Sequence, residues 1–412
     1  MEGRSLCAGR MRDRLRDFLG LEPNIVVMLA AIVILGMGEE LWSRFIPKYL
    51  ELLGAGAGAI AVYGTLKDLL DAVYQYPGGW TADRFGRRFS LILFTGLAIL
   101  GYLLYIFSPT WEWILVGTIF VMAWSSLTLP AIFSIIGDNL PSSRRAIGFG
   151  VQSILKRVPI VLAPVIGGAF ITALGLAKGM RLSLAITALL ALAAIAIVHR
   201  FYVEKVPPAQ DKVRVKEIWR AMDPHLKKLL VSDCLARWAE GIPKVFIVLY
   251  VINVLRDSAF QFGLLTSVQM LTAILVYIPI AKLSDRMNRK PFVLMTFAFF
   301  ALFPLAIATA GGAISLTAAF VIGGLREIGE PARKALILDL AGEAWRGRTV
   351  GLYYLLRGLI VFPASLVGGW LWAINPEYPF QVAFVMGLAG IASYAVWGPG
   401  AAPVPPREES RG

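Results

Sequence analysis

The sequence contains few charged residues and very few cysteines. Charged side chains make up only 16% of the 412 residues, whereas hydrophobic side chains make up 57%. Soluble domains carry roughly 25% charged residues, so this composition excludes an ordinary soluble globular protein. The two cysteines, Cys7 and Cys234, lie in a basic tail and in an apolar segment. This placement argues against a disulfide between them.

The sequence also lacks the signatures of most enzymes. It shows no P-loop, no zinc-binding spacing and no Ser/His/Asp grouping, and its two histidines flank one polar segment. We therefore expect no cofactor, no metal site, no ATP-driven pumping and no enzymatic activity. A formal net charge of +13 would suggest a nucleic-acid partner in a soluble protein. Here the positions of the charges matter more than their sum, and we expect no nucleic-acid partner.

Long apolar runs recur along nearly the whole chain. Each run is long enough to cross about 30 Å of hydrocarbon as a helix. A transmembrane β-barrel would instead show segments of about 10 residues with alternating polarity. We therefore predict an all-α membrane protein with twelve transmembrane helices, at approximately residues 25–48, 56–77, 89–108, 112–137, 147–174, 181–203, 226–254, 260–281, 291–310, 313–339, 349–373 and 379–398.

The basic residues outside these runs fall mainly on one side of the predicted membrane. The opposite side holds only Lys48, Lys178, Arg181 and Arg256. By the positive-inside rule, both termini are cytoplasmic in a multi-pass protein of the cell membrane. The predicted parts are an N-terminal tail (1–24), a six-helix bundle (25–203), a cytoplasmic linker (204–225), a second six-helix bundle (226–398) and a C-terminal tail (399–412).

The two halves repeat each other at an offset of about 200 residues. Segment 83–88 matches segment 285–290, and Ile46-Pro47-Lys48 matches Ile242-Pro243-Lys244. Arg157 and Arg357 also correspond, each about ten residues before a Gly-Gly pair. Two bundles in the same orientation, related about the membrane normal, form the architecture of one transporter class. The repeat therefore predicts two pseudo-symmetric six-helix bundles.

The loop between the second and third runs carries a family likeness. It reads Gly79-Trp80-Thr81-Ala82-Asp83-Arg84-Phe85-Gly86-Arg87-Arg88. This closely resembles the loop 2–3 signature of the major facilitator superfamily, G-x-L-a-D-r-x-G-r-k, with Thr81 as the clear departure. With the twelve spans and the repeat, the resemblance covers essentially the whole chain. It implies the fold of that superfamily and secondary transport by alternating access, and leaves the substrate open.

The motif also predicts a latch on the cytoplasmic face. The two glycines let helix ends approach a neighbour closely, and Asp83 can sit at a helix N-terminus or pair with an arginine. The alternative is a basic turn that only sets the topology. The predicted gating residues of the motif and its second copy are Gly79, Asp83, Arg84, Gly86, Arg87, Asp285, Arg286 and Arg289.

Ionisable residues recur inside the spans at helical spacing. A charge at a helix centre costs about 2.5–3.5 kcal/mol even on a lenient insertion scale, so such groups must face water, a partner or a ligand. In the seventh span Asp233, Arg237, Glu240 and Lys244 fall on one helical face. The first and tenth spans carry similar stripes. The family resemblance implies that spans 1, 4, 7 and 10 line a central cavity.

We therefore predict that substrate or protons bind along these stripes. Desolvation penalises the charged form of a carboxylate, which makes the acidic residues candidate proton carriers. The alternative is structural ion pairing, and Lys48, Lys244, Arg333 and Lys334, nearest the span ends, are expected to snorkel. The predicted binding residues are Glu39, Glu40, Arg44, Trp124, Asp233, Arg237, Glu240, Arg326, Glu327 and Glu330, with Trp124 opening a polar wall that continues through Ser125, Ser126 and Thr128.

Arg157 and Arg357 form a separate case, one third of the way along spans 5 and 11. In the resembling family, span 2 faces span 11. Asp68 or Asp71 could therefore pair with Arg357 in one orientation of the bundles and separate in the other. The two arginines could alternatively hold an anion such as a phosphate or carboxylate, or pack statically.

These features leave three functional hypotheses. The first is a proton-coupled secondary transporter of a small amphipathic or charged organic solute, leaning to export because Gly150 to Gly167 is similar to an antiporter signature. The second is a proton symporter or exchanger for organic anions or zwitterions, centred on Arg44, Arg237 and Arg326, with Arg357 as a further candidate. Glu40 to Phe45 is also similar to the E-x-x-E-R-F motif of peptide transporters. The third is a receptor that has a transporter fold but moves no solute.

The expected partners are a small-molecule substrate, protons and the lipid bilayer, and we expect a monomer.

Overall fold

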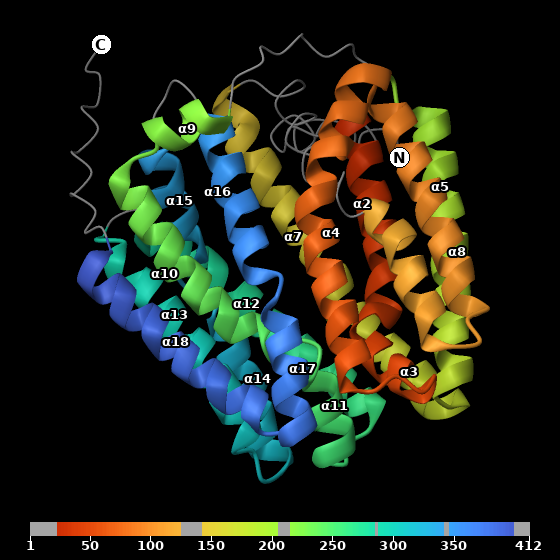
Figure 1. Ribbon diagram of the computed structural model, residues 1–412. Helices are drawn as coiled ribbons and strands as arrows, with labels where there is room; N and C mark the ends of the chain where they lie inside the picture. Colours follow the sequence, from red (N-terminus) through yellow and green to blue (C-terminus); the bar gives the residue numbers. More distant parts are fainter. Residues whose placement is uncertain (1–22, 125–141, 205–214, 285–286, 342–345, 399–412) are drawn as a thin grey trace, which may run out of the picture. The chain divides into compact units, whose positions relative to one another are not determined.

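The computed structural model describes residues 23–124, 142–204, 215–284, 287–341 and 346–398, and within these ranges every regular element is helical (Figure 1). The chain forms two compact units. The first comprises residues 1–210 and 251–267, and the second comprises residues 211–250 and 268–412. The bundle boundaries inferred from the sequence stay a prediction.

Eight helical segments in the described ranges are long and apolar enough to cross a membrane. They correspond to predicted spans 1, 3, 5, 6, 8, 9, 11 and 12. The helix Trp111–Trp124 is a shorter apolar helix in span 4. Spans 2, 7 and 10 carry several charges each, which lowers their mean hydropathy and sets them apart from these eight.

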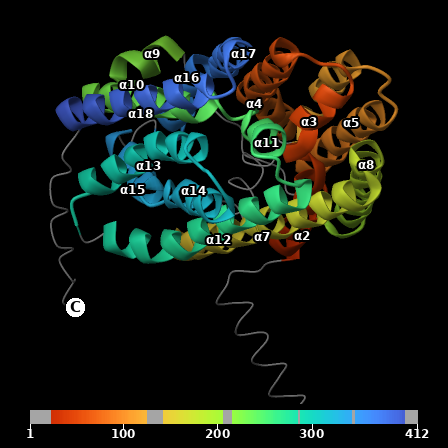
Figure 2. The ribbon, with the colours of Figure 1, turned by 90° about the horizontal axis from the view of Figure 1, so that it is seen from below.

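The first unit packs its apolar helices closely around α8. Its elements are α2 (Pro23–Trp42), a 3₁₀ turn (Ser43–Phe45), α3 (Ile46–Leu52), α4 (Ala57–Phe85), α5 (Arg87–Ile106), the helix Trp111–Trp124, α7 (Ser142–Leu174) and α8 (Leu176–Phe201). α8 packs against both α2 and α5 (Figures 1 and 2). Thr187 of α8 donates a hydrogen bond to the carbonyl oxygen of Gly38 at 2.8 Å. Small residues at such crossings let membrane helices approach closely.

A segment from the second half of the sequence belongs to this unit by its contacts. Asn253 donates to Glu51 at 2.8 Å and accepts from Lys48, which also pairs with Glu51 at 2.5 Å. Phe262 packs edge-on against Phe45, with ring centroids 5.6 Å apart. Lys48 is therefore held by two polar partners at the end of the first span.

The second unit surrounds a core of aromatic and aliphatic side chains. Its elements are α9 (Val215–Ala221), α10 (Pro224–Gly241), α11 (Ile247–Leu249), a π-helical stretch that runs on from it (Tyr250–Val254), α12 (Ala259–Ser284), α13 (Lys290–Ala308), α14 (Ala313–Leu325), α15 (Glu330–Leu340), α16 (Arg346–Val361), α17 (Ala364–Ile374) and α18 (Tyr378–Trp397). The π-helical stretch and α12 contribute residues to both units. α18 packs along α10 and α13, and Leu226, Phe297 and Tyr394 are buried between them. α9 lies in the predicted linker and adds Ile218 to this core, and Met222 joins the core just beyond the end of α9.

Four spans are interrupted in the part of the chain that the structure describes. α2 gives way to a 3₁₀ turn before α3, and the five residues 242–246 separate the end of α10 from the start of α11. α14 and α15 are separated by Arg326–Gly329, and α16 and α17 by Phe362 and Pro363. Proline removes a backbone donor and disfavours a continuous helix. The matching Ile46-Pro47-Lys48 and Ile242-Pro243-Lys244 triads lie at two of the breaks, so both copies interrupt their spans.

A carboxylate stabilises the turn between α4 and α5. Gly86 has a φ of 87°, a backbone conformation that favours glycine. Glu204, just beyond α8, accepts hydrogen bonds from the backbone N–H groups of Arg87 and Arg88, both at 2.8 Å. An acidic group at a helix N-terminus satisfies free N–H groups and interacts favourably with the helix dipole. Glu204 therefore fixes the first turn of α5 to the end of α8.

Replacing Glu204 with alanine should lower the stability of the first unit. Loss of a capping side chain costs about 0.5–2 kcal/mol, and Glu204→Gln, which keeps acceptor capacity but no charge, should cost less. Thermal unfolding of the purified protein in detergent measures both effects. Glu217→Ala, on the exposed face of α9, is the matched control. An unfolding midpoint for Glu204→Ala equal to that of the control would contradict the capping role.

Candidate functional site

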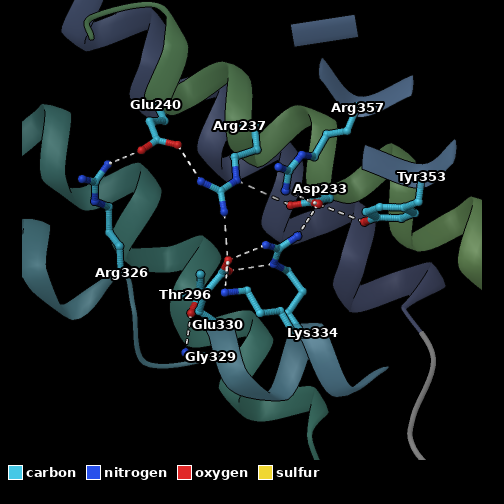
Figure 3. A network of polar contacts seen from close by, with 11 residues as sticks. Asp233, Arg237, Glu240, Thr296, Arg326, Gly329, Glu330, Lys334, Tyr353 and Arg357 are labelled. Carbon is cyan, nitrogen blue, oxygen red and sulfur yellow. Dashed lines mark hydrogen bonds and ion pairs between the residues drawn. The ribbon is translucent and has the colours of Figure 1, made fainter. Parts of the chain in front are cut away.

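The break between α14 and α15 sets the position of the charged residues of the tenth span. Gly329 approaches α13 so closely that a side chain there would collide with the carbonyl oxygen of Phe292. Its N–H donates to the hydroxyl of Thr296 at 2.6 Å, which replaces a helical hydrogen bond (Figure 3). Arg326 donates through Nε to the carbonyl oxygen of Gly323 at 2.8 Å. α15 then begins at Glu330, followed by Pro331, a favourable residue in a first helical turn.

Asp233 and Arg333 form the buried end of a network of charges. Arg333 Nη1 donates to Asp233 Oδ2 at 2.5 Å, and its Nε and Nη2 bind the two oxygens of Glu330 at 2.9 and 2.6 Å. The side chains of Arg333 and Asp233 are each 1% exposed. Arg333 thus joins the seventh span to the tenth. The expectation that Arg333 snorkels is wrong, because its guanidinium points inward to two carboxylates rather than out to the membrane surface.

Asp233 Oδ2 accepts from two further donors on α16. The hydroxyl of Tyr353 donates at 2.9 Å, and Arg357 Nη1 lies 3.4 Å away. The other oxygen, Oδ1, lies 3.9 Å from Nε of Arg237. Asp233 therefore connects three interrupted spans.

Arg237 and Glu240 continue the network toward its more exposed end. Arg237 Nη1 donates to Glu240 Oε2 at 2.7 Å, and its Nη2 lies 3.5 Å from Glu330 Oε2. Arg326 Nη1 lies 3.4 Å from Glu240 Oε1. The Glu240 side chain is 31% exposed, in contrast to the sealed Asp233. The shared helical face predicted for the seventh span is confirmed for Asp233, Arg237 and Glu240 by their mutual contacts. Lys244 does not continue that face, because α10 ends at Gly241.

We call this set of residues the charge network. Its members are Asp233, Arg237, Glu240, Arg326, Glu330, Arg333, Lys334 and Arg357 (Figure 3). Aromatic rings support its cations: Arg237 and Arg326 lie over the ring of Phe300, and Arg357 lies over Tyr354. Glu327 belongs to the same break in the tenth span, between Arg326 and Gly329.

The first unit places its predicted binding residues in two smaller groups. Glu39 Oε2 accepts a hydrogen bond from the indole N–H of Trp124 at 3.1 Å, and Glu40 pairs with Arg44 at 2.9 Å. Three residues beyond Glu39 on α2, Trp42 packs edge-on against Tyr102 and Tyr105, with ring centroids 5.8 and 5.5 Å apart. Ser125, Ser126 and Thr128 lie outside the described residues.

The predicted gating residues have mixed surroundings. Arg84 is exposed and lies over the rings of Trp80 and Phe85, while Arg87 is buried. Arg289 pairs with Asp339. Asp285 and Arg286 lie outside the described residues, and Gly79 and Asp83 lie in α4. Asp68, Asp71 and Arg157 each take part in a side-chain interaction. The gating roles of all these residues stay predictions.

Arg357 pairs with Asp233 in this structure, within its own unit. The switching pair with Asp68 or Asp71 stays a prediction.

The sequence did not predict four residues that contribute to these sites: Tyr353, Thr296, Phe300 and Glu204. The first three are uncharged, and only the folded chain brings them to the network, whereas Glu204 is an ordinary acidic residue of a predicted linker. Within the described ranges, no cluster of three or more His, Cys, Asp or Glu residues is arranged to hold a metal ion.

Replacing Arg333 with methionine should strongly destabilise the second unit. The substitution leaves Asp233 and Glu330 buried without their shared cation, and breaking a buried pair from one side costs about 3–5 kcal/mol. A second substitution, Asp233→Asn, should restore part of the loss because it removes one of the uncompensated charges. The unfolding temperature of the detergent-purified variants measures this. Lys334→Met, at a neighbouring side chain that is 50% exposed, should change it little; equal effects of the two single variants would contradict the assignment.

Comparisons with known proteins extend over both halves of the chain. A model of the family described as Major Facilitator Superfamily matches residues 27–254 and 229–412. An uncharacterized MFS-type transporter of Methanocaldococcus jannaschii is 21% identical over 387 residues, which cover 89% of this chain and 93% of that protein. The multidrug resistance protein MdtG of Escherichia coli is 21% identical over 385 residues, covering 90% and 92% of the two chains.

Solved structures share the fold. The nucleoside transporter NupG gives a TM-score of 0.74 at 13% identity, covering 91% of this chain and 99% of that one. A peptide transporter POT in complex with sulfate gives 0.73 at 16% identity, covering 91% and 93%. Both likenesses confirm the all-helical transporter fold expected from the sequence. Because the family model matches nearly the whole chain, this protein belongs to the major facilitator superfamily of multi-pass membrane transporters.

Proposed function

We propose that this transporter moves a small charged or amphipathic organic solute by alternating access and couples the movement to protons. The observation that carries the proposal is the charge network, which links three interrupted spans and runs from a sealed Asp233 to a partly exposed Glu240. Interrupted helices with charged side chains at the break are typical of the substrate and ion sites of secondary transporters. Carboxylates held only by side chains can exchange protons without rearrangement of the backbone.

Export is the direction that the likeness to a multidrug resistance protein supports. That relative is 21% identical to this chain, and multidrug resistance is a property of the relative. The similarity of span 5 to an antiporter signature points the same way.

The second candidate is proton symport or exchange of an organic anion or zwitterion. A specific observation favours it: four guanidinium groups and Lys334 face three carboxylates in the charge network. A surplus of positive charge inside a membrane domain attracts an anionic group. Arginine presents paired donors that match a carboxylate or phosphate.

Coupling to protons can be tested without a labelled substrate. In inside-out vesicles that maintain a pH gradient, addition of a transported solute should dissipate the gradient, reported by acridine orange fluorescence. We expect a response to at least one solute in a panel of cationic, zwitterionic and anionic aromatic compounds. Glu240→Gln should reduce it at least tenfold, because the amide cannot take up a proton.

Glu377→Gln is the control for this experiment, since it neutralises an exposed carboxylate of the same unit at the start of α18. It should respond like the unmodified protein. Flux of a solute into proteoliposomes at the same rate with and without an imposed pH gradient would overturn the coupling and leave the transport itself intact.

Both termini are proposed to be cytoplasmic, and the two cysteines allow a direct test. Cys234 is buried. Because the sequence has two cysteines, Cys7 is the remaining thiol in a Cys234→Ala variant. A membrane-impermeant maleimide should label Cys7 in inside-out vesicles and leave it unlabelled in intact cells. Labelling in intact cells, with a cytoplasmic marker protein left unlabelled, would reverse the orientation.

A further inference from the structure

Glu240 lies between two arginines that come from different spans. Its Oε2 accepts from Arg237 Nη1 at 2.7 Å, and its Oε1 lies 3.4 Å from Arg326 Nη1 (Figure 3). Arg237 belongs to α10, as Glu240 does, whereas Arg326 stands in the break of the tenth span. Each carboxylate oxygen of Glu240 therefore faces one guanidinium group.

The two guanidinium groups are held in place by aromatic rings. The Cζ atoms of Arg237 and Arg326 lie 4.8 and 5.2 Å from the ring centroid of Phe300, and that of Arg326 lies 4.6 Å from Phe303. Contacts of this kind attract cations to the face of a ring. Because these contacts do not involve Glu240, they would persist if its carboxylate moved away. The two arginines thus form a seat for an anionic group that exists before any ligand arrives.

The charge of the network favours an anion at this seat. Even when Glu327 is counted with Asp233, Glu240 and Glu330, the carboxylates are outnumbered by the cations Arg237, Arg326, Arg333, Arg357 and Lys334. A further anion would lower the electrostatic cost of holding these cations in a membrane domain.

Burial separates the replaceable carboxylate from the structural ones. The side chains of Asp233 and Glu330 are 1% and 11% exposed, and both are fixed by Arg333. Glu240 is 31% exposed. A group that a ligand displaces has to be reachable from outside the network, and Glu240 meets this condition better than the other two carboxylates.

We propose that the anionic group of the substrate replaces the Glu240 carboxylate between Arg237 and Arg326, and that Glu240 binds a proton as it leaves. This proposal rests on the second candidate of the proposed function and names its substrate class: a small organic anion or zwitterion that carries a carboxylate, sulfonate or phosphonate. One anion and one proton enter together, so the total charge of the network is the same before and after the exchange.

The surroundings of Glu240 explain why the two events are linked. The charged groups near it are Arg237 and Lys244 on its own side of the break in span 7, and Arg326 from span 10. Glu330 of α15 lies beyond Arg237, 3.5 Å from its Nη2. α13 contributes the neutral ring of Phe300. When an external anion occupies the two guanidinium groups, Glu240 loses the cations that favour its charged form, so anion and proton strengthen each other's binding.

Benzenesulfonate is a suitable probe because it stays ionised across the working pH range. Its binding to the purified full-length protein is measured by calorimetry and thermal shift at several pH values and constant ionic strength. We expect binding that strengthens up to tenfold for each unit of decreasing pH while Glu240 is ionised in the free protein. Glu240→Gln should bind at least as tightly as the unmodified protein, with no pH dependence.

Arg326→Gln and Arg237→Gln should each weaken binding at least tenfold. Arg326→Lys keeps the charge without the planar fork of donors and should fall between. The matched controls are Glu377→Gln for the carboxylate and Lys227→Gln for the cations, and both should bind like the unmodified protein. If an arginine variant does not fold, the pH profiles of the unmodified protein and Glu240→Gln decide the matter alone.

Three results would overturn the proposal: equal binding of neutral benzenesulfonamide, preference for benzyltrimethylammonium, or the same pH profile in Glu240→Gln as in the unmodified protein. Failure of this proposal and failure of the broader proposed function give different results. Proton-coupled flux of another solute without benzenesulfonate binding would contradict only the anion seat. Benzenesulfonate binding with no solute-induced loss of a pH gradient would sink the coupled transport and leave the seat standing.

Discussion

A charge inside a membrane-spanning helix needs a partner, because lipid provides neither counter-charge nor hydrogen bonds. The second unit meets this constraint by bringing three spans to one carboxylate, Asp233, through Arg333, Arg357 and Tyr353. The same constraint shapes the backbone. Glu330 begins α15, where an acidic side chain interacts favourably with the helix dipole, and the break before it frees Arg326 to reach Glu240. The interruption of span 10 and its charges therefore support each other.

Much of this architecture is predictable because it depends on local properties of the sequence. Hydropathy marks the apolar spans, and the 3.6-residue helical period places Asp233, Arg237 and Glu240 on one face, as their contacts confirm. The direction in which a long side chain points is a different matter. Arg333 lies near a predicted span end, where an arginine usually extends its guanidinium to the membrane surface. It points inward instead, because there it pairs with two carboxylates, those of Asp233 and Glu330.

Other parts depend on contacts that no local pattern reveals. Tyr353, Thr296 and Phe300 resemble any other residue of a membrane helix until the fold places them beside Asp233, Gly329 and Arg237. The internal repeat gives partial guidance. Its two Ile-Pro-Lys triads mark breaks in spans 1 and 7, but their lysines have different neighbours: Lys48 pairs with Glu51 and Asn253, whereas Lys244 lies near Glu240. The repeat thus predicts where the backbone is interrupted but not what the side chains there contact.

Stability alone is a poor explanation for the charge network. A buried ion pair recovers little more than the cost of desolvating its members, and well-packed apolar residues in its place are often as stabilising or more so. An apolar tenth span would also insert into the membrane more easily than one with Arg326, Glu327, Glu330 and Arg333. The increase in side-chain exposure from the buried Asp233 to the partly exposed Glu240 is equally unnecessary for packing. Both features are what a transporter needs if fixed inner pairs are to hold a more exposed outer pair ready for exchange with a ligand.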